Sequence, residues 1–235
     1  MGKKDNVTLV SGFWDVVGPY PQETMKQWIQ SAIRINQRMY FFCDEATKPF
    51  IQKCRGDLDT IILIHNITDF YSHGIYNEAW IKGVMEIPTH KYGLTLVERI
   101  NLIKMAKDLD GDDATPYYVW YDPTFSPYRD QIPPSVRLNF HSVPAFLDTR
   151  VGVSGYYPEH DDKVVDGSAY VLHRDMIDDV FVYYYNLLKT NYLLVTKREL
   201  RSDETIMSVI YKSMPALFYE MATGPGGNLL NIYNM

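Results

Sequence analysis

The chain has 235 residues, of which 46% are hydrophobic and 22% are charged, as in an ordinary globular domain. These fractions exclude a disordered tail, a collagen-like fibre and a disulfide scaffold. No apolar run approaches the roughly 18 residues that a membrane span needs, and no secretory signal is visible at the start. We therefore expect a cytoplasmic protein without a transmembrane segment.

The charge balance and the cysteine content narrow the range of partners. The chain carries 29 acidic and 23 basic residues, a net charge of −6, which disfavours binding to a nucleic acid polymer but not to a single nucleotide. Cys43 and Cys54 are too few for a metal cage and indicate a reducing compartment. The 19 tyrosines favour a tyrosine-rich core, with a sugar- or base-binding surface as the alternative.

Strands and helices alternate through the first half of the chain. Apolar, β-branched and aromatic runs predict strands at Val7–Val10, Arg38–Cys43, Asp59–Ile64 and Tyr117–Tyr121. Apolar residues at helical spacing predict helices over 25–33, 45–55 and 96–108. This alternation predicts a parallel sheet with right-handed crossovers.

The second half is less regular. Residues 65–92 predict a long functional loop or small insert, and the six prolines within 123–163 predict loops and short strands. A strand at Asp166–Leu172, an amphipathic helix over 177–188 and a helix capped by Ser202 follow. We predict a single domain over residues 1–222 and a Gly-rich tail over 223–235.

The carboxyl ends of the predicted strands select the candidate site, because ligands of open α/β sheets bind there. The first strand ends at Ser11, Gly12 and Phe13, the second at Asp44 and the fourth at Asp122. A carboxylate at the end of a buried strand needs a partner. Asp122 therefore predicts a Mg²⁺ or Mn²⁺ site, which suits a diphosphate. The alternative is an aspartate that caps its own turn before Pro123.

Asp203 and Glu204 form a second pair of candidate carboxylates. They follow Ser202 at the start of a predicted helix, where they would satisfy free N–H groups and complement the helix dipole. The alternative is a catalytic or acceptor-binding role in a cleft. The sequence lacks the glycine patterns of dinucleotide-binding and P-loop proteins, the serine hydrolase elbow and zinc-ligand spacing.

Several motifs together resemble a known family. In chain order they are V-T-L-V-S-G-F-W-D, F-F-C-D-E-A-T, K-Y-G-L-T-L-V-x-x-I-N-L-I-K and Y-Y-V-W-Y-D. Their order and spacing resemble the HtrL/YibB-like group of glycosyltransferases over roughly Val7 to Glu220. The resemblance implies a GT-A-like fold, that is, a Rossmann-like α/β domain with a mostly parallel central sheet flanked by helices.

The resemblance also implies roles for the donor-side residues. A nucleotide-diphosphate sugar would lie across the strand ends, with Ser11, Gly12, Phe13 and Asp44 around the base and ribose. Lys104 would pair with phosphate or with an acid. Asp122 would take the place of the metal-binding D-x-D motif. The chain departs from that motif, because Pro123 and Thr124 follow and the second acid is missing.

The remaining implied roles concern the acceptor and the chemistry. Asp166, Gly167 and Ser168 resemble the acceptor-side strand of such enzymes, and Asp203 or Glu204 would serve as the base of an inverting enzyme. A retaining outcome stays open. The missing second acid leaves a second hypothesis, a non-catalytic nucleotide- or glycan-binding protein of the same fold. A third is a glycoside hydrolase that uses Asp122 and Asp203 as its carboxyl pair.

Overall fold

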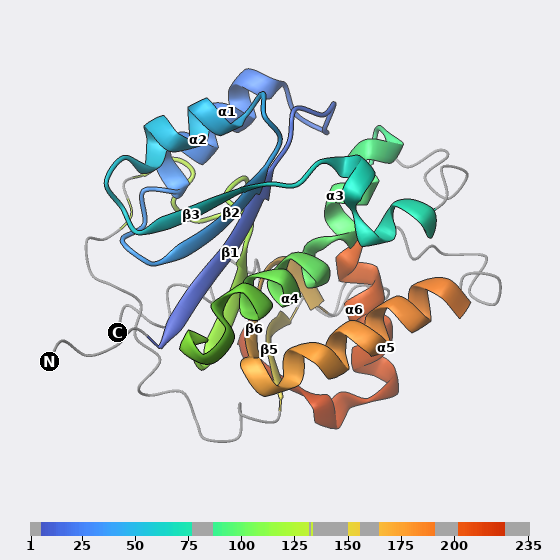
Figure 1. Cartoon of the computed structure of the whole chain (residues 1–235). Coiled ribbons are helices and arrows are strands. Elements are labelled where there is room, and N and C mark those ends of the chain that lie inside the picture. Colours follow the sequence, from blue (N-terminus) through green and yellow to red (C-terminus); the bar gives the residue numbers. More distant parts are fainter. Residues whose placement is uncertain are drawn as a thin grey trace, which may run out of the picture.

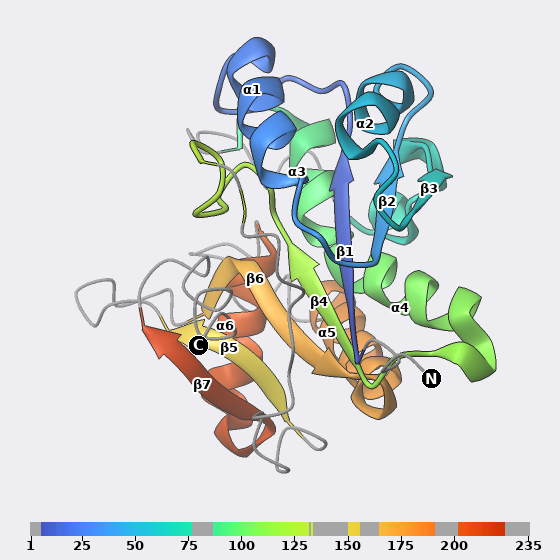
Figure 2. The same ribbon diagram turned by 90° about the vertical axis from the view of Figure 1, so that its left-hand side faces the viewer.

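The computed structural model describes residues 6–76, 87–131, 133, 150–155, 165–190 and 202–223. In these ranges a seven-stranded sheet has helices on both faces (Figures 1 and 2). The strands are β1 (Val7–Phe13), β2 (Met39–Cys43), β3 (Thr60–Ile64), β4 (Tyr117–Tyr121), β5 (Val151–Gly155), β6 (Val165–His173) and β7 (Phe218–Thr223). The α-helices are α1 (Gln22–Ala32), α2 (Lys48–Arg55), α3 (His90–Val97), α4 (Arg99–Asp110), α5 (Ile177–Thr190) and α6 (Asp203–Ser213).

The sheet has the order β3-β2-β1-β4-β6-β5-β7. The pairs β3–β2, β2–β1, β1–β4 and β5–β7 are parallel, whereas β6 is antiparallel to both β4 and β5. The predicted α/β class with a mostly parallel sheet is therefore confirmed. The four strands predicted in the first half lie side by side, so their carboxyl ends meet at one edge.

Two hydrophobic cores cover the two faces of this sheet. Leu9 faces one core with Ile29 of α1, whereas Val10, the next residue of β1, faces the other core with Ile100 of α4. This alternation is what a strand covered on both sides produces. Five tyrosines are among the largest fully buried side chains: Tyr118, Tyr121, Tyr170, Tyr184 and Tyr185. The interpretation of a tyrosine-rich core is confirmed at these positions.

The helix predicted over 96–108 spans the end of α3 and most of α4, which are two separate helices. It divides at Glu98, between α3 and α4, and the Glu98 carboxylate is fully buried. It accepts hydrogen bonds from the Tyr71 N–H at 2.9 Å, the Ser72 N–H at 3.0 Å and the Ser72 hydroxyl at 2.6 Å. A buried carboxylate needs such donors, so Glu98 fixes the loop after β3 against the start of α4.

The sequence did not predict β7, which pairs with β5 and is the last strand of the sheet within the described ranges. The Gly-rich tail was predicted over 223–235, but Thr223 is the last residue of β7. The rest of that tail and most of the proline-rich segment 123–163 lie outside the described residues. Among the helices that are described, none is both long enough and apolar enough to cross a membrane.

Candidate functional site

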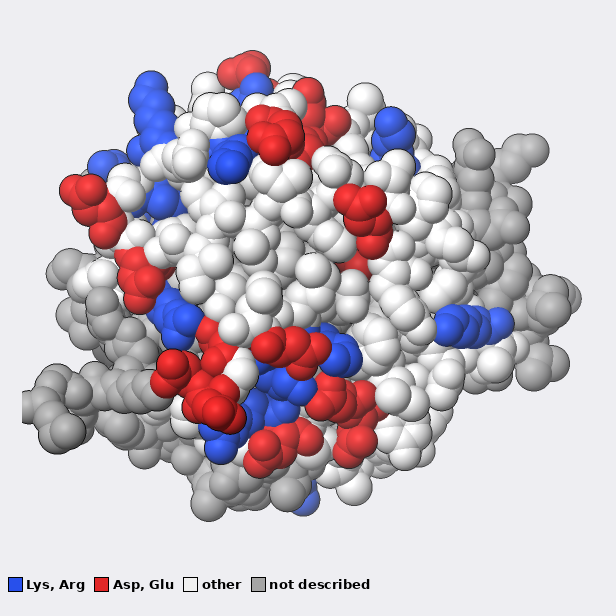
Figure 3. Space-filling model, viewed as in Figure 1, with Lys and Arg blue, Asp and Glu red and all other residues white. Residues whose placement is uncertain are grey.

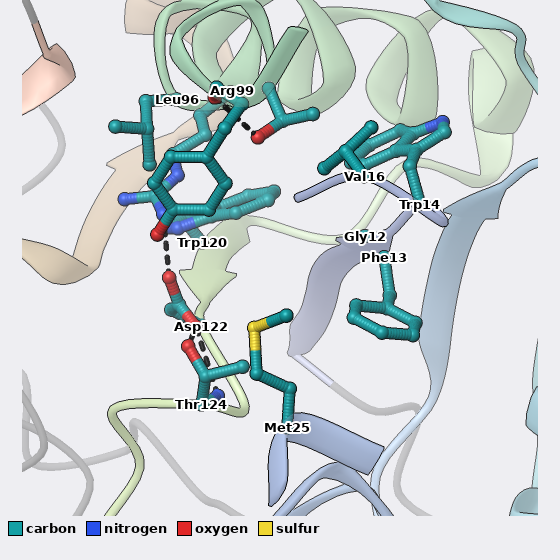
Figure 4. A pocket seen from close by; sticks show the side chains of 12 residues that line it. Gly12, Phe13, Trp14, Val16, Met25, Leu96, Arg99, Trp120, Asp122 and Thr124 are labelled. Carbon is teal, nitrogen blue, oxygen red and sulfur yellow. Dashed lines mark hydrogen bonds and ion pairs between the residues drawn. The ribbon is translucent and has the colours of Figure 1, made fainter. Parts of the chain in front are cut away.

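A pocket opens at the carboxyl ends of β1 and β4 (Figure 4). Figure 4 shows Arg99, Trp120 and Asp122 on one side of it and Phe13 and Trp14 on the other. The remaining lining comes from Gly12, Val16, Met25, Tyr92, Thr95, Leu96 and Thr124. The strand-end rule thus located a pocket that contains three of the predicted residues, namely Gly12, Phe13 and Asp122.

Arg99, the first residue of α4, is the centre of a buried charge cluster. Its Nη2 donates to Asp122 Oδ2 at 2.5 Å, and its Nη1 donates to Asp203 Oδ2 at 2.9 Å and to the Gly167 carbonyl at 2.8 Å. The guanidinium also lies 5.0 Å from the centre of the Trp120 ring, a cation–π contact. Burial opposes its charge, yet Asp203 and Asp122 hold the pKa of Arg99 above its ordinary value.

Asp122 uses both carboxylate oxygens in this structure. Oδ2 receives the Arg99 guanidinium, and Oδ1 accepts from the Thr124 N–H at 2.9 Å and the Thr124 hydroxyl at 2.6 Å. Its side chain is 8% exposed. Asp122 therefore caps its own turn, as the alternative interpretation held, and it also lines the pocket.

Asp203, the first residue of α6, is 1% exposed. One oxygen pairs with Arg99, whereas Oδ1 has no partner among the described residues. Burial raises the pKa of Asp203 to about 7, against the opposing effect of Arg99 and with a smaller contribution from Glu204. Arg99 is the one hydrogen-bond partner of the Asp203 side chain among the described residues, so its pairing does not outweigh the effect of burial.

The raised pKa of Asp203 predicts a specific dependence of stability on pH. Between about pH 4 and pH 7 the folded chain holds a proton on Asp203 that the unfolded chain has released, so this group's contribution to stability falls as the pH rises. Calorimetric melting of the wild type and of Asp203→Asn across this window checks it. The Tm difference, wild type minus variant, is expected to decrease with pH. A difference that stays constant across this window would mean that Arg99 keeps Asp203 ionised in the folded chain.

The predicted acceptor-side residues lie next to this cluster. The Asp122 N–H donates to the Ser168 carbonyl at 2.9 Å across the β4–β6 pair. Asp166 Oδ1 accepts from the Ser168 N–H at 2.7 Å and from the Ser168 hydroxyl. The Gly167 N–H donates to Glu204 Oε1 at 3.2 Å. The structure therefore brings Asp122, both helix-start acids and the 166–168 segment together around Arg99.

Gly167 permits the close approach of α6 to β6. A Cβ at this position would lie 2.5 Å from Glu204 Cγ and 2.8 Å from Asp203 Oδ2. We expect Gly167→Ala to lower the free energy of unfolding by about 1–3 kcal/mol, the usual effect of overpacking. Gly74→Ala is the matched control, since a Cβ there meets nothing within 4 Å. Urea unfolding of both variants checks this, and equal losses would contradict the close packing of Glu204 on Gly167.

Two other predicted donor residues do not line the pocket. Ser11 is fully buried within β1, and its hydroxyl has no partner among the described residues. Asp44 binds the turn before α2, accepting from the Thr47 N–H at 2.8 Å, and ties down the loop after β1 by accepting from the Asp15 N–H at 2.9 Å. Asp44 therefore shapes the loop beside the pocket.

Lys104 is not brought to this pocket. Its side chain is 28% exposed and pairs with Asp108 at 2.5 Å and with Asp178 of α5 at 3.3 Å. Figure 3 shows acidic and basic side chains intermingled on this face of the molecule. Lys104 was expected to pair with phosphate or with an acid, and it pairs with acids. A phosphate in the pocket would contact Arg99 instead.

The predicted metal at Asp122 does not fit the donors that the chain provides. Both Asp122 oxygens are occupied, and within the described ranges no group of three His, Cys, Asp or Glu side chains could hold a metal ion. A divalent ion about 4 Å from the Arg99 guanidinium would be repelled by about 8 kcal/mol at an effective dielectric constant of about 20. We therefore assign the cation position beside Asp122 to Arg99.

The comparisons with known proteins concern the fold. No family model matches the sequence, and no curated protein matches it. An active-site mutant of LgtC superposes with a TM-score of 0.51 at 10% identity, covering 87% of this chain and 70% of LgtC. The galactosyltransferase LgtC with donor and acceptor sugar analogues gives a TM-score of 0.47 at 10% identity, with 87% and 70% covered. The PaToxG glycosyltransferase gives 0.47 at 13% identity, with 90% and 70% covered.

The structural neighbours are thus glycosyltransferases, and the first comparison shows a shared fold. The resemblance to the HtrL/YibB-like group remains a prediction. The chain has a single-domain, GT-A-like α/β fold.

Proposed function

We propose that this chain is a glycosyltransferase that moves a sugar from a nucleotide-diphosphate sugar to an acceptor hydroxyl. The observation that carries the proposal is the pocket at the carboxyl ends of β1 and β4, where Gly12 and Phe13 face Arg99 and Asp122 in a GT-A-like fold. Ligands of open α/β sheets bind at this edge. In this proposal Gly12 and Phe13 border the base and ribose, and the diphosphate lies toward Arg99.

The chemistry assigns separate roles to the two helix-start acids. The acceptor oxygen forms a bond to the anomeric carbon while the bond from that carbon to the diphosphate breaks. The diphosphate leaves with the electron pair of that bond, and the proton of the acceptor hydroxyl goes to a base. Glu204 is partly exposed, whereas Asp203 is 1% exposed and paired with Arg99. We assign Glu204 as the base of an inverting reaction and Asp203 as a positioning residue that holds Arg99.

Exposed aromatic side chains beside the pocket support a sugar acceptor. Tyr20 and Phe125 are 40% and 41% exposed, and their ring centres lie 6.4 Å apart. Phe125 directly follows Thr124, which lines the pocket. Tyr20 also packs edge-on against Trp28 at 4.9 Å. Such a surface offers flat apolar faces to a sugar ring.

Phe125→Ala is expected to weaken acceptor binding and leave nucleotide binding unchanged. An aromatic contact contributes about 0.5–1.5 kcal/mol, so the KM for the acceptor should rise roughly two- to tenfold. Steady-state kinetics with varied acceptor checks this. Val182→Ala, an exposed apolar residue of α5, is the control. An unchanged acceptor KM in Phe125→Ala would remove the aromatic surface from the acceptor site.

Donor turnover tests the proposed function. The purified chain is incubated with UDP-, GDP-, TDP- and ADP-sugars, with and without a mixture of simple glycosides, and the released nucleoside diphosphate is measured. We expect release from one class of donor, increased by acceptor. Nucleotide binding without release of nucleoside diphosphate from any donor would instead favour a non-catalytic binding protein. The missing second acid is the feature that motivates this second hypothesis.

The glycoside hydrolase hypothesis has less support. Its two carboxyl groups must both face a sugar, but Asp122 and Asp203 are bound to the same guanidinium, and Asp203 is almost fully buried. Release of sugar from a glycoside in the absence of nucleotide would support the glycoside hydrolase hypothesis.

A further inference from the structure

The turn after β4 is closed on itself. Asp122 is followed by Pro123 and Thr124, and both donors of Thr124, the N–H and the hydroxyl, bind Asp122 Oδ1. Thr124 stands at the position where a D-x-D motif has its second acid. At this position the chain has no second carboxylate, and the two donors of Thr124 occupy one oxygen of Asp122.

The second oxygen of Asp122 is taken by a cation that belongs to the fold. Arg99 binds Asp122, Asp203 and the Gly167 carbonyl, and its guanidinium lies over the Trp120 ring. These contacts come from β4, β6, α6 and the turn after β4, and the Arg99 side chain is 7% exposed. A guanidinium held in this way is a fixed charge, and its fork geometry matches phosphate as well as carboxylate.

We propose that this chain binds the diphosphate of its donor without a divalent metal ion, with Arg99 as the fixed positive charge that the diphosphate meets. The inference rests on the proposed function, since it concerns the same donor. It follows from the two occupied oxygens of Asp122, from Thr124 in place of an acid and from Arg99 in the lining of the pocket.

Nucleotide binding tests this directly. UDP, GDP, TDP and ADP are titrated into the full chain by isothermal titration calorimetry, once with EDTA and once with Mn²⁺. We expect one nucleotide to bind with the same dissociation constant in both buffers. Binding that requires Mn²⁺ would overturn the inference and leave the proposed glycosyl transfer standing. No binding of any nucleotide in either buffer would overturn both.

Mn²⁺ alone provides an independent measurement. Electron paramagnetic resonance of Mn²⁺ titrated into the wild type should show only free ion, and a bound ion that Asp122→Asn releases would overturn the inference. Arg99→Met opens the Asp122 and Asp203 carboxylates to each other. Where this variant folds, judged by circular dichroism, it is expected to bind Mn²⁺, and Arg99→Met with Asp122→Asn is expected to lose it. A folded Arg99→Met chain that binds no Mn²⁺ would show that Arg99 does not occupy a metal position.

Discussion

Replacing Arg99 with methionine is expected to lower the free energy of unfolding by about 3–5 kcal/mol, the usual effect of leaving buried charges unpaired. Arg99 is the only side chain described as pairing with both Asp122 and Asp203, which are 8% and 1% exposed. Without it two carboxylates in one small space lose their compensating charge. Methionine keeps much of the apolar volume, so the effect reports on charge and hydrogen bonds. Urea unfolding followed by circular dichroism measures it.

Two controls isolate the charge effect of Arg99→Met. Lys91→Met removes a cation from an exposed position on α3 and is expected to change stability by less than about 0.5 kcal/mol. Adding Asp122→Asn and Asp203→Asn to Arg99→Met removes the unpaired charges and should restore most of the lost stability. A single Arg99→Met variant as stable as the wild type would show that the cluster does not organise the strand ends.

The sheet was predictable because its strands carry strong local signals. β1, β2 and β4 are rich in apolar and aromatic residues and are buried along almost their whole length, as strands covered by helices must be. The break at Glu98 was not predictable from periodicity. Leu96, Ile100 and Ile103 continue one apolar stripe across it, and the break depends on the contact of Glu98 with Ser72 from a distant loop.

The edge strand β7 shows a second limit. Its sequence, Phe218–Thr223, contains Glu220 and gives only a weak alternating pattern. The strand is defined by its pairing with β5, which itself lies at the end of the proline-rich segment. Pairing between segments so far apart leaves little trace in either sequence alone.

The candidate site was only partly predictable. The strand-end rule identified Asp122, and the helix-start pattern identified Asp203 and Glu204, but neither identified the side chain that joins them. Arg99 occupies one of the two unspecified positions in K-Y-G-L-T-L-V-x-x-I-N-L-I-K, and Glu98 occupies the other. A signal was present, because two adjacent opposite charges interrupt an apolar stripe. Charges at such positions are rarely tolerated unless each has a buried partner.

The choice of Lys104 illustrates why helix phase matters. It lies on the same helix as Arg99, five residues further along, and it carries the same charge. Five residues place a side chain about 140° around the helix. Lys104 therefore reaches Asp178 of α5, whereas Arg99 points to the strand ends. The sequence predicted that a cation of this helix serves the site, but it did not predict which face of the helix turns toward the strand ends.

Glu204→Gln is expected to reduce turnover of the proposed transfer reaction by about 10²–10⁴-fold, the usual contribution of a positioned base. Glutamine keeps the side-chain length and an oxygen that can accept from the Gly167 N–H, as Glu204 Oε1 does at 3.2 Å. The fold and the nucleotide affinity should therefore persist while the proton acceptor is lost. Product formation with saturating donor and acceptor, together with calorimetric melting and nucleotide titration, separates these effects.

Asp203→Asn is the matched control, because it removes the neighbouring carboxylate from the same helix turn. Asp203 holds Arg99 and is almost fully buried, so its substitution should change stability and its pH dependence more than it changes the proton transfer. Full turnover in Glu204→Gln combined with a large loss in Asp203→Asn would reverse the two assignments. It would require the buried carboxylate to reach the acceptor, which would mean that α6 moves away from Arg99 when substrates bind.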